Sequence, residues 1–488
     1  MKSTTIDETE TQSSPNKREP SSAFMPKDTK AAERERQKNK GLDRRKRNGT
    51  SKQPTVIIYD EHKGITAYDR YGWKRWGTDV RPSSEWLGDT PIASEFADNG
   101  VITCAYQSSI FGINARDGSI AWKTELPKKD CFETVKSVFQ NEKYALILTK
   151  PGILRHYPPG TNENGVKALS LTDGKECWNA TDLNDVMAIT ENYAVLSGKW
   201  RRTAEMVSLK TGKETGKVNF GNYSPTAFCA EGKTIAYAPA VNVERPTEGV
   251  NVHAKTCLLD ESGKTLDTTV EDRKGGTINL LSLSKNAELL ATATKYRDER
   301  CVDAEKDEYV ITVYSKNDAK QQDKEYSRVW SEHASGPVLG LKFDPENEHL
   351  IATTQLTETE LRRYQYTVDL ITSYDPCKGK KQWEHRCNKK YTNRETEDMK
   401  SERMNGPVMA LSHDGLVYVG SGALGAYERS GTPGFCALNI NDGQQMEQIR
   451  IEPAVKKQGG PMYLATNVKS IAVRKTHTVY GGGGGSGG

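Results

Sequence analysis

Residues 111–122, FGINARDGSIAW, decide the fold of this chain. An apolar run ends in a polar turn at Gly118, and a second short run ends at Trp122. Asp-Gly supplies the positive φ that a tight hairpin turn needs. Phe111 and Ile113 alternate with less apolar residues, which is typical of a strand whose sheet has two different faces. The segment therefore predicts a strand, a turn and a second strand.

The same pattern recurs along the chain, as an internal repeat. Copies with both the glycine and the tryptophan are ITAYDRYGWKRW (65–76, Gly72 and Trp76), KALSLTDGKECW (167–178, Gly174 and Trp178) and TSYDPCKGKKQW (372–383, Gly379 and Trp383). Copies that keep only the glycine are EMVSLKTGKETG (205–216, Gly212), TCLLDESGKTLD (256–267, Gly263) and CALNINDGQQME (436–447, Gly443). A degenerate copy with an expanded turn, 311–330, ends at Trp330. The glycines lie about 38 to 64 residues apart, the length of a four-stranded blade with variable loops.

A second element precedes the hairpins and indicates how the ring closes. It starts with small residues and continues as strand, turn and strand, as in 275–294, 336–354 and 406–422. The first copy, 55–76, lacks this element, and the segment 459–480 supplies one at the other end of the chain. We therefore expect the strand near Val56 to pair with a strand near Met462, which removes a free sheet edge.

These patterns predict an all-β fold, a β-propeller of eight four-stranded blades, with seven blades as the alternative. The predicted domains are a disordered basic arm at 1–54, the propeller at 55–480 and a flexible Gly/Ser tail or linker at 481–488. The tryptophans at the repeat position could stack on a cofactor, but their recurrence favours packing between blades. This set is Trp76, Trp122, Trp178 and Trp383.

The turn and strand chemistry resembles the repeat of PQQ-like (quinoprotein) propellers over roughly residues 55–480. The best local match is LVYVGSG (416–422) followed by GFCALNINDGQQ (434–445), whereas 336–354 is more similar to a WD40 strand pair, the alternative family. The PQQ-like resemblance implies either a dehydrogenase that holds pyrroloquinoline quinone and calcium or a non-catalytic interaction scaffold.

Several features favour the non-catalytic branch. The nine cysteines include no vicinal pair of the kind found beside the quinone, and no calcium-binding set of Glu, Asn and Asp is identifiable. The spacing of Cys377, His385 and Cys387 matches no standard zinc module. His156, His253, His333, His385 and His413 lie in different repeats, with no hydrolase motif around them. We therefore expect no enzyme activity, no cofactor and no metal, with a quinoprotein-like oxidoreductase as an alternative.

The formal net charge of +4 is concentrated in the N-terminal arm, which carries 14 Lys and Arg against 8 Asp and Glu in residues 1–54. The basic residues that could contact a polyanion are Lys38, Lys40, Arg44, Arg45, Lys46 and Arg47. Three interpretations stay open: contact with nucleic acid or another polyanion, a targeting signal, and a solvated arm. No apolar run follows the basic residues as in a signal peptide, so we expect a cytoplasmic protein, or a nuclear one in a eukaryote.

Two polar segments are predicted to be long insertions between blades, at TELRRYQY (359–366) and at 385–406. Insertions on one rim of a propeller often bind partners. The sequence thus predicts a propeller scaffold that binds a protein partner, not identified by the sequence, through its rim or top-face loops.

Overall fold

The structure of the protein is a computed structural model that describes residues 56–473 with gaps. The gaps are 61–63, 69–73, 81–91, 94–99, 107, 127–133, 151–164, 199–202, 221–224, 240–252, 261, 275, 297–306, 317–325, 361–363, 393–407, 413–414, 421–433 and 451–467. The chain divides into two units, Met1–Ser51 and Lys52–Gly488, and all described residues belong to the second. The predicted basic arm and the Gly/Ser tail lie outside the described residues.

The described residues form eight four-stranded antiparallel sheets, numbered here in chain order. Sheet 1 is β1 (Val56–Asp60), β2 (Gly64–Tyr68), β3 (Lys74–Thr78) and β32 (Val468–Val473); sheet 2 is β4 (Ile92–Ala93), β5 (Val101–Tyr106), β6 (Ser109–Asn114) and β7 (Ile120–Glu125). Sheet 3 is β8 (Thr134–Gln140), β9 (Tyr144–Lys150), β10 (Gly165–Ser170) and β11 (Glu176–Thr181); sheet 4 is β12 (Leu183–Ile189), β13 (Tyr193–Gly198), β14 (Thr203–Ser208) and β15 (Glu214–Asn219).

The second half of the chain continues the series. Sheet 5 is β16 (Ala227–Glu231), β17 (Thr234–Ala238), β18 (His253–Leu259) and β19 (Thr265–Lys274); sheet 6 is β20 (Gly276–Leu283), β21 (Leu289–Tyr296), β22 (Glu308–Lys316) and β23 (Tyr326–Ala334). Sheet 7 is β24 (Val338–Phe343), β25 (Leu350–Glu360), β26 (Tyr364–Tyr374) and β27 (Lys381–Thr392); sheet 8 is β28 (Val408–Ser412), β29 (Leu416–Gly420), β30 (Gly434–Asn439) and β31 (Gln445–Arg450). A short 3-10 turn, η1 (Lys285–Ala287), lies between β20 and β21.

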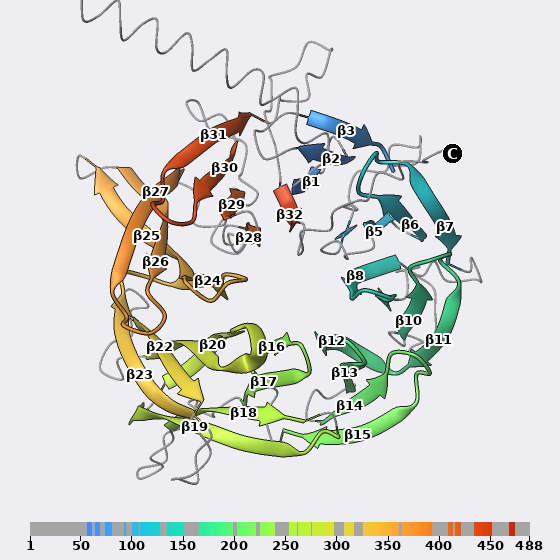
Figure 1. The fold of residues 1–488 in the computed structure, drawn as a ribbon, viewed down its shortest axis with the longest axis horizontal. Helices are drawn as coiled ribbons and strands as arrows, with labels where there is room; N and C mark the ends of the chain where they lie inside the picture. The colour runs from blue at the N-terminus through green and yellow to red at the C-terminus, as the bar shows by residue number, and fades with distance from the viewer. Residues whose placement is uncertain are drawn as a thin grey trace, which may run out of the picture. The chain divides into compact units, whose positions relative to one another are not determined.

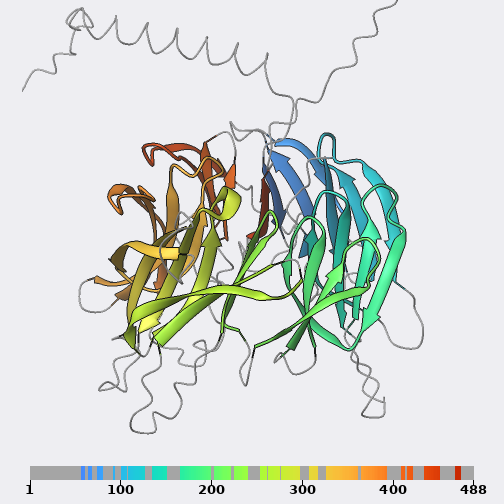
Figure 2. The ribbon, with the colours of Figure 1, turned by 60° about the horizontal axis from the view of Figure 1, so that its bottom comes forward.

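Each of sheets 2 to 8 is a meander, because neighbouring strands in the sheet are also neighbours in sequence. Within the second unit, Figure 1 shows the fourth strands, such as β7, β15 and β23, on the outside and the first strands, such as β8, β20 and β24, on the inside. Figure 2, turned from that view, shows the strands of successive sheets running alongside one another. This arrangement of packed four-stranded meanders is a β-propeller.

Apolar clusters hold each sheet to the next. One cluster joins Ile65 and Ala67 of sheet 1 to Ile102 and Phe111 of sheet 2, and equivalent clusters join every consecutive pair from sheet 2 to sheet 8. The second and third strands of a sheet place side chains in the apolar clusters on both of its faces. Almost all of their residues are therefore buried, as in β5 and β6. Strands buried on both faces have apolar runs instead of strict alternation. The core is therefore distributed between the sheets.

Sheet 1 is completed by the end of the chain. β32 pairs antiparallel with β1, with Ile58 opposite Ile471, and β32 also contacts β28 of sheet 8. The pairing lies within the predicted segment 459–480, but β32 begins at Val468, and Met462 lies outside the described residues. The strand formed by the first residues of the propeller thus has neighbours on both sides, β2 and β32.

Of the two predicted insertions between blades, the first is wrong, and the second is wrong only in its first eight residues, since 393–407 does join sheets 7 and 8. The segment 359–366 lies inside sheet 7, where β25 and β26 pair from Leu350 opposite Tyr374 to Glu360 opposite Tyr364. The segment 385–406 begins as strand, because β27 continues to Thr392. Threonine and tyrosine are frequent in these stretches, and they favour strands even where charged residues surround them. No helix in the described part of the chain is long and apolar enough to cross a membrane.

Candidate interaction surface

The repeat tryptophans join each sheet to the next through one hydrogen bond. The indole Nε1 of Trp122, on the fourth strand of sheet 2, donates to the carbonyl oxygen of Leu171 in the turn between the third and fourth strands of sheet 3. The same bond links Trp76 to Ala115 (2.9 Å), Trp178 to Leu209 (2.7 Å), Trp330 to Pro376 (2.7 Å) and Trp383 to Ile440 (2.6 Å). These tryptophans therefore pack between sheets, and no cofactor is needed to explain them.

The repeat glycines let the turns approach these rings. Gly174 has φ +69°, and a Cβ built on it would lie 2.5 Å from Cε3 of Trp122. Gly118, Gly212, Gly379 and Gly443 also have positive φ, and a Cβ on any of them would lie 2.6 to 2.7 Å from the ring of the preceding sheet's tryptophan. Glycine is thus required twice over, for backbone conformation and for space.

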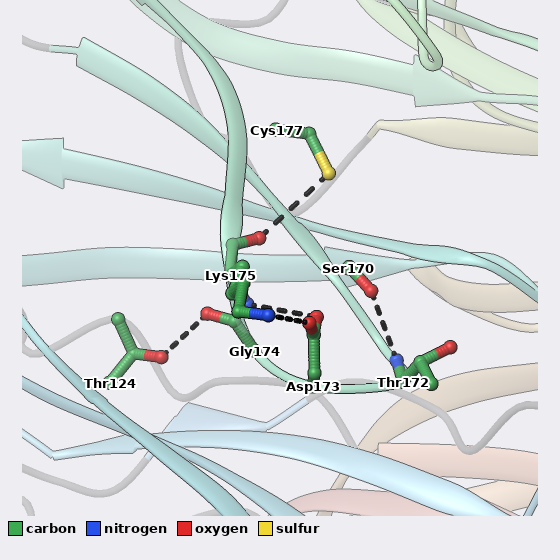
Figure 3. Close-up of polar contacts among 7 residues, drawn as sticks. All are labelled: Thr124, Ser170, Thr172, Asp173, Gly174, Lys175 and Cys177. Atoms are coloured by element: carbon green, nitrogen blue, oxygen red, sulfur yellow. Dashed lines mark hydrogen bonds and ion pairs between the residues drawn. The ribbon is translucent and has the colours of Figure 1, made fainter.

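Figure 3 shows the polar contacts around one such turn. The hydroxyl of Thr124 donates to the carbonyl oxygen of Gly174 (2.6 Å), which adds a second bond between sheets 2 and 3. The Asp173 carboxylate accepts the backbone N–H of Lys175 and pairs with its ammonium at 2.9 Å. These bonds hold the pKa of Asp173 below its usual range and raise the pKa of Lys175. The exposed turn is therefore fixed from both sides.

Gly216 and Trp330 illustrate two of the departures from this pattern. Gly216 stands where other copies have tryptophan, and a Cβ on it would lie 2.0 Å from the carbonyl oxygen of Ser262, so the turn of sheet 5 fills that space. Gly263 in that turn has φ +81°, and a Cβ on it would lie 3.1 Å from Sδ of Met206. Trp330, from the degenerate copy, has the same bond as the others, although the spacing of the repeat did not place it among them. Gly72 lies outside the described residues.

These contacts define two ends of the sheets. The tryptophan bonds bring the turns between third and fourth strands together from sheet to sheet, and Asn141 and Asn347 link turns between first and second strands in the same way. In an antiparallel meander both kinds of turn lie at one end, called here the turn end. The opposite end, called the connection end, receives the connections between second and third strands and the links from one sheet to the next.

The two ends differ in the length of their connections. At the turn end, connections within a sheet span two to nine residues. At the connection end, four connections within sheets are longer: 151–164, 239–252, 297–307 and 421–433. Three links between sheets are also longer: 79–91, 393–407 and 451–467. Long connections are common places for binding residues on a rigid scaffold. The connection end is therefore the candidate interaction surface.

Sheet 6 presents a charged cluster at the connection end. Lys295 and Asp307 form an ion pair at 2.5 Å, in which the Asp307 side chain is only 8% exposed. The hydrogen bond that Lys295 donates to Asp307 raises the pKa of Lys295, and the Lys295 ammonium lies 5.9 Å from the centre of the Tyr309 ring. Burial raises the pKa of the Tyr309 phenol. Because the Lys295 and Asp307 charges are paired with each other, this cluster is more consistent with a structural role than with a catalytic acid or base.

A second pair lies beside it. Nδ1 of His333 lies 2.6 Å from a carboxylate oxygen of Glu308, and the His333 side chain is 72% exposed. Of the five histidines singled out in the sequence, His333 is the one whose ring contacts an acidic side chain among the described residues. The others are separate: His253 lies in β18 and His385 in β27, while His156 and His413 lie outside the described residues. Burial lowers the pKa of His385.

His, Cys, Asp and Glu side chains are the possible metal ligands among the described residues of the sheets and turns. Within the residues that the structure describes, no group of three or more His, Cys, Asp or Glu could hold a metal ion. Cys377 is exposed in the turn before β27 and has no disulfide partner. Burial raises the pKa of the Cys229 thiol to about 12, which makes it a poor nucleophile.

Sequence reasoning missed a buried polar network around His349. Nδ1 of His349 lies 3.0 Å from the hydroxyl of Ser373 and 2.5 Å from Oε1 of Gln382, while Nε2 lies 3.2 Å from Oδ1 of Asn441 in sheet 8. The Asp344 carboxylate accepts the backbone N–H of His349 (2.8 Å), not a ring N–H. Serine, histidine and aspartate therefore meet without the contacts of a catalytic triad, and the ring joins sheets 7 and 8.

Asp344→Asn is expected to stabilise the protein at neutral pH. Burial raises the pKa of Asp344 above its usual value, so the ionised carboxylate destabilises the folded protein at pH 7. This destabilisation disappears below the ordinary Asp pKa, because the carboxyl group is then protonated in both the folded and the unfolded protein. The amide keeps an acceptor for the His349 N–H. Urea unfolding from pH 7 to pH 4 measures the difference. A gain at pH 7 that shrinks toward zero at pH 4 is expected, and a gain that grows with acid would contradict the assignment.

No protein-family model matches the chain, and no curated protein matches it in sequence. Among solved structures it is similar to BamB from Moraxella catarrhalis, with 11% identity and a TM-score of 0.39 over 76% of this chain and 96% of that one. It is also similar to Hsv2 from Kluyveromyces lactis (9%, TM-score 0.41, 74% and 99%) and to quinohemoprotein alcohol dehydrogenase from Comamonas testosteroni (10%, TM-score 0.42, 73% and 68%). With TM-scores below 0.5, these likenesses assign neither a family nor an activity to this chain.

Proposed function

We propose that the chain is a non-enzymatic β-propeller scaffold of eight blades, closed by β1 and β32, that binds protein partners at its connection end. One observation carries the proposal. The turn end is used by the sheets themselves, since its short turns accept the tryptophan bonds, whereas seven connections of 11 to 17 residues join strands at the opposite end. Variation in length is tolerated where a connection does not have to fit a neighbouring sheet.

The polar groups of the interior support a structural role over a catalytic one. The His349 ring contacts polar groups of sheets 7 and 8, and Lys295 is paired with Asp307 within sheet 6. The quinoprotein alternative requires a bound quinone and calcium, and a titration of both with melting temperature as the readout distinguishes it. The polyanion alternative concerns the basic arm, and removal of residues 1–54 tests it across a salt series.

The proposal predicts that partner binding depends on one end of the sheets. A connection-end variant replaces 239–252 and 393–407 by five-residue Gly/Ser linkers, and a turn-end variant carries Lys175→Glu, Lys213→Glu and Lys264→Glu. Each is used as bait in extract of the native host, and captured proteins are quantified by mass spectrometry. Proteins captured by the unaltered chain should fall about tenfold with the connection-end variant, equivalent to roughly 1.4 kcal/mol, and change less than about twofold with the turn-end variant.

Matching melting temperatures of the two variants provide the folding control. Equal losses with both variants would contradict binding at the connection end. An unaltered chain that captures no protein above background would contradict the scaffold role itself.

A further inference from the structure

The outer strand of sheet 7 differs from every other outer strand that the structure describes. β27 spans 12 residues, against 5 to 10 for β3, β7, β11, β15, β19, β23 and β31. It is the last strand of its sheet, with β26 as its one strand neighbour there. The pairing of β26 with β27 continues to Gln365 opposite Thr392, whereas the pairing of β24 with β25 stops at Val338 opposite Thr354. Sheet 7 thus extends toward the connection end as a three-stranded ribbon.

The same strand carries the highest charge of the set. β27 contains Lys381, Arg386, Lys389 and Lys390 with Glu384 as its one acid, a net charge of +3, whereas the other outer strands range from −1 to +2. Lys380 precedes the strand and is exposed, as are Lys381 and Arg386. Lys381 forms an exposed ion pair with Glu384 at 2.6 Å, and such pairs contribute little to stability.

An exposed edge strand is the kind of element to which another chain adds by backbone hydrogen bonding. Natural edges are often protected by lysines, which repel a second copy of the same basic strand. The same charge attracts a strand of opposite sign, because oppositely charged cross-strand pairs are stabilising. The combination selects against self-association and for an acidic strand.

We propose that β27 binds an extended, acidic peptide segment of a partner protein, which adds to sheet 7 as a fifth strand. The inference rests on the proposed scaffold function and names one docking element and the chemistry of its partner. Backbone bonds supply the affinity, and the basic side chains of β27 select glutamate-rich or aspartate-rich segments.

The probe is a fluorescein-labelled peptide of ten residues in which glutamate and threonine alternate, followed by fluorescence anisotropy on the full chain. A second peptide has the same charge but proline in place of every threonine, which removes half of the backbone donors. A ten-nucleotide single-stranded DNA is the third probe. The Glu/Thr peptide should bind at least about tenfold more tightly than the proline peptide.

Variants locate the site. Arg386→Glu, Lys389→Glu and Lys390→Glu together, all within β27, should weaken the Glu/Thr peptide by about tenfold or more. The matched control Lys175→Glu, Lys213→Glu and Lys217→Glu reverses three exposed lysines on and before the outer strands of sheets 3 and 4, and should change binding less than about twofold. Equal binding of the two peptides, tighter binding of the DNA that the β27 variant abolishes, or no peptide binding would each overturn strand addition. If host partners remain bound to the β27 variant, this inference fails while the scaffold function stands.

Discussion

Gly174→Ala is expected to lower the free energy of unfolding by about 3 kcal/mol, a large effect for a single added methyl group. Gly174 has φ +69°, which costs an alanine about 1–2 kcal/mol. The new Cβ would also lie 2.5 Å from Cε3 of Trp122, and overpacking costs about 1–3 kcal/mol more. Urea unfolding followed by circular dichroism measures the sum.

Gly232→Ala is the matched control, since it separates the two causes. Gly232 has φ +56°, but a Cβ on it would meet nothing within 4 Å. The control should therefore cost only the backbone part, about 1–2 kcal/mol. If the two alanine variants lose the same stability, the close approach of the Gly174 turn to the tryptophan has no energetic consequence.

A double-mutant cycle tests the contact itself. Trp122→Leu removes the indole bond to Leu171 and part of the packing, and should cost about 3 kcal/mol. In that background Gly174→Ala should cost no more than Gly232→Ala, because the ring that it would touch is gone. An undiminished cost of Gly174→Ala without Trp122 would contradict the inter-sheet role of this pair.

Removal of β32 is expected to have the largest effect of all. Five residue pairs join β1 to β32, and a backbone hydrogen bond contributes about 1 kcal/mol net, so truncation after residue 467 should cost about 5 kcal/mol. It also leaves β1 as a free edge beside β2, which favours association between chains. Thermal unfolding and size-exclusion chromatography over a range of concentrations report both consequences.

Truncation after residue 480 is the control, because it removes only the Gly/Ser tail. This shorter truncation should leave the melting temperature unchanged. A truncation after residue 467 that unfolds at the same temperature and stays monomeric would show that β32 does not complete sheet 1.

The repeat was predictable from sequence because its chemistry is local. Gly118 and Gly174 lie in turns that only a few residues specify, and Trp122 follows at a fixed distance, so the hairpins are visible in the printed sequence. The missing first strand of the first copy also indicated that another part of the chain must supply it, and β32 pairs there. These predictions needed no knowledge of which residues meet across the ring.

Features that depend on contacts between repeats were not predictable. Trp330 follows an expanded turn, so its position in the sequence does not indicate the hydrogen bond that its indole donates to the carbonyl oxygen of Pro376 in the next sheet. His349 precedes β25 like any polar turn residue, and its partner Asn441 is 92 positions away. The end of β25, the start of β26 and the second part of β27 were mistaken for insertions because charge was weighed above the β-propensity of threonine and tyrosine.

Trapping β1 against β32 by a disulfide tests the central claim most directly, namely that the chain closes on itself into one ring of sheets. Ile58→Cys and Ile471→Cys place two thiols at directly paired positions, whereas Ile58→Cys with Val473→Cys places them two residues out of register, too far apart for a disulfide. Mass spectrometry of non-reduced peptides from the monomer identifies the bond. The account predicts an intrachain disulfide between positions 58 and 471 and little between 58 and 473. A disulfide found only between chains, or formed equally by both pairs, would contradict it.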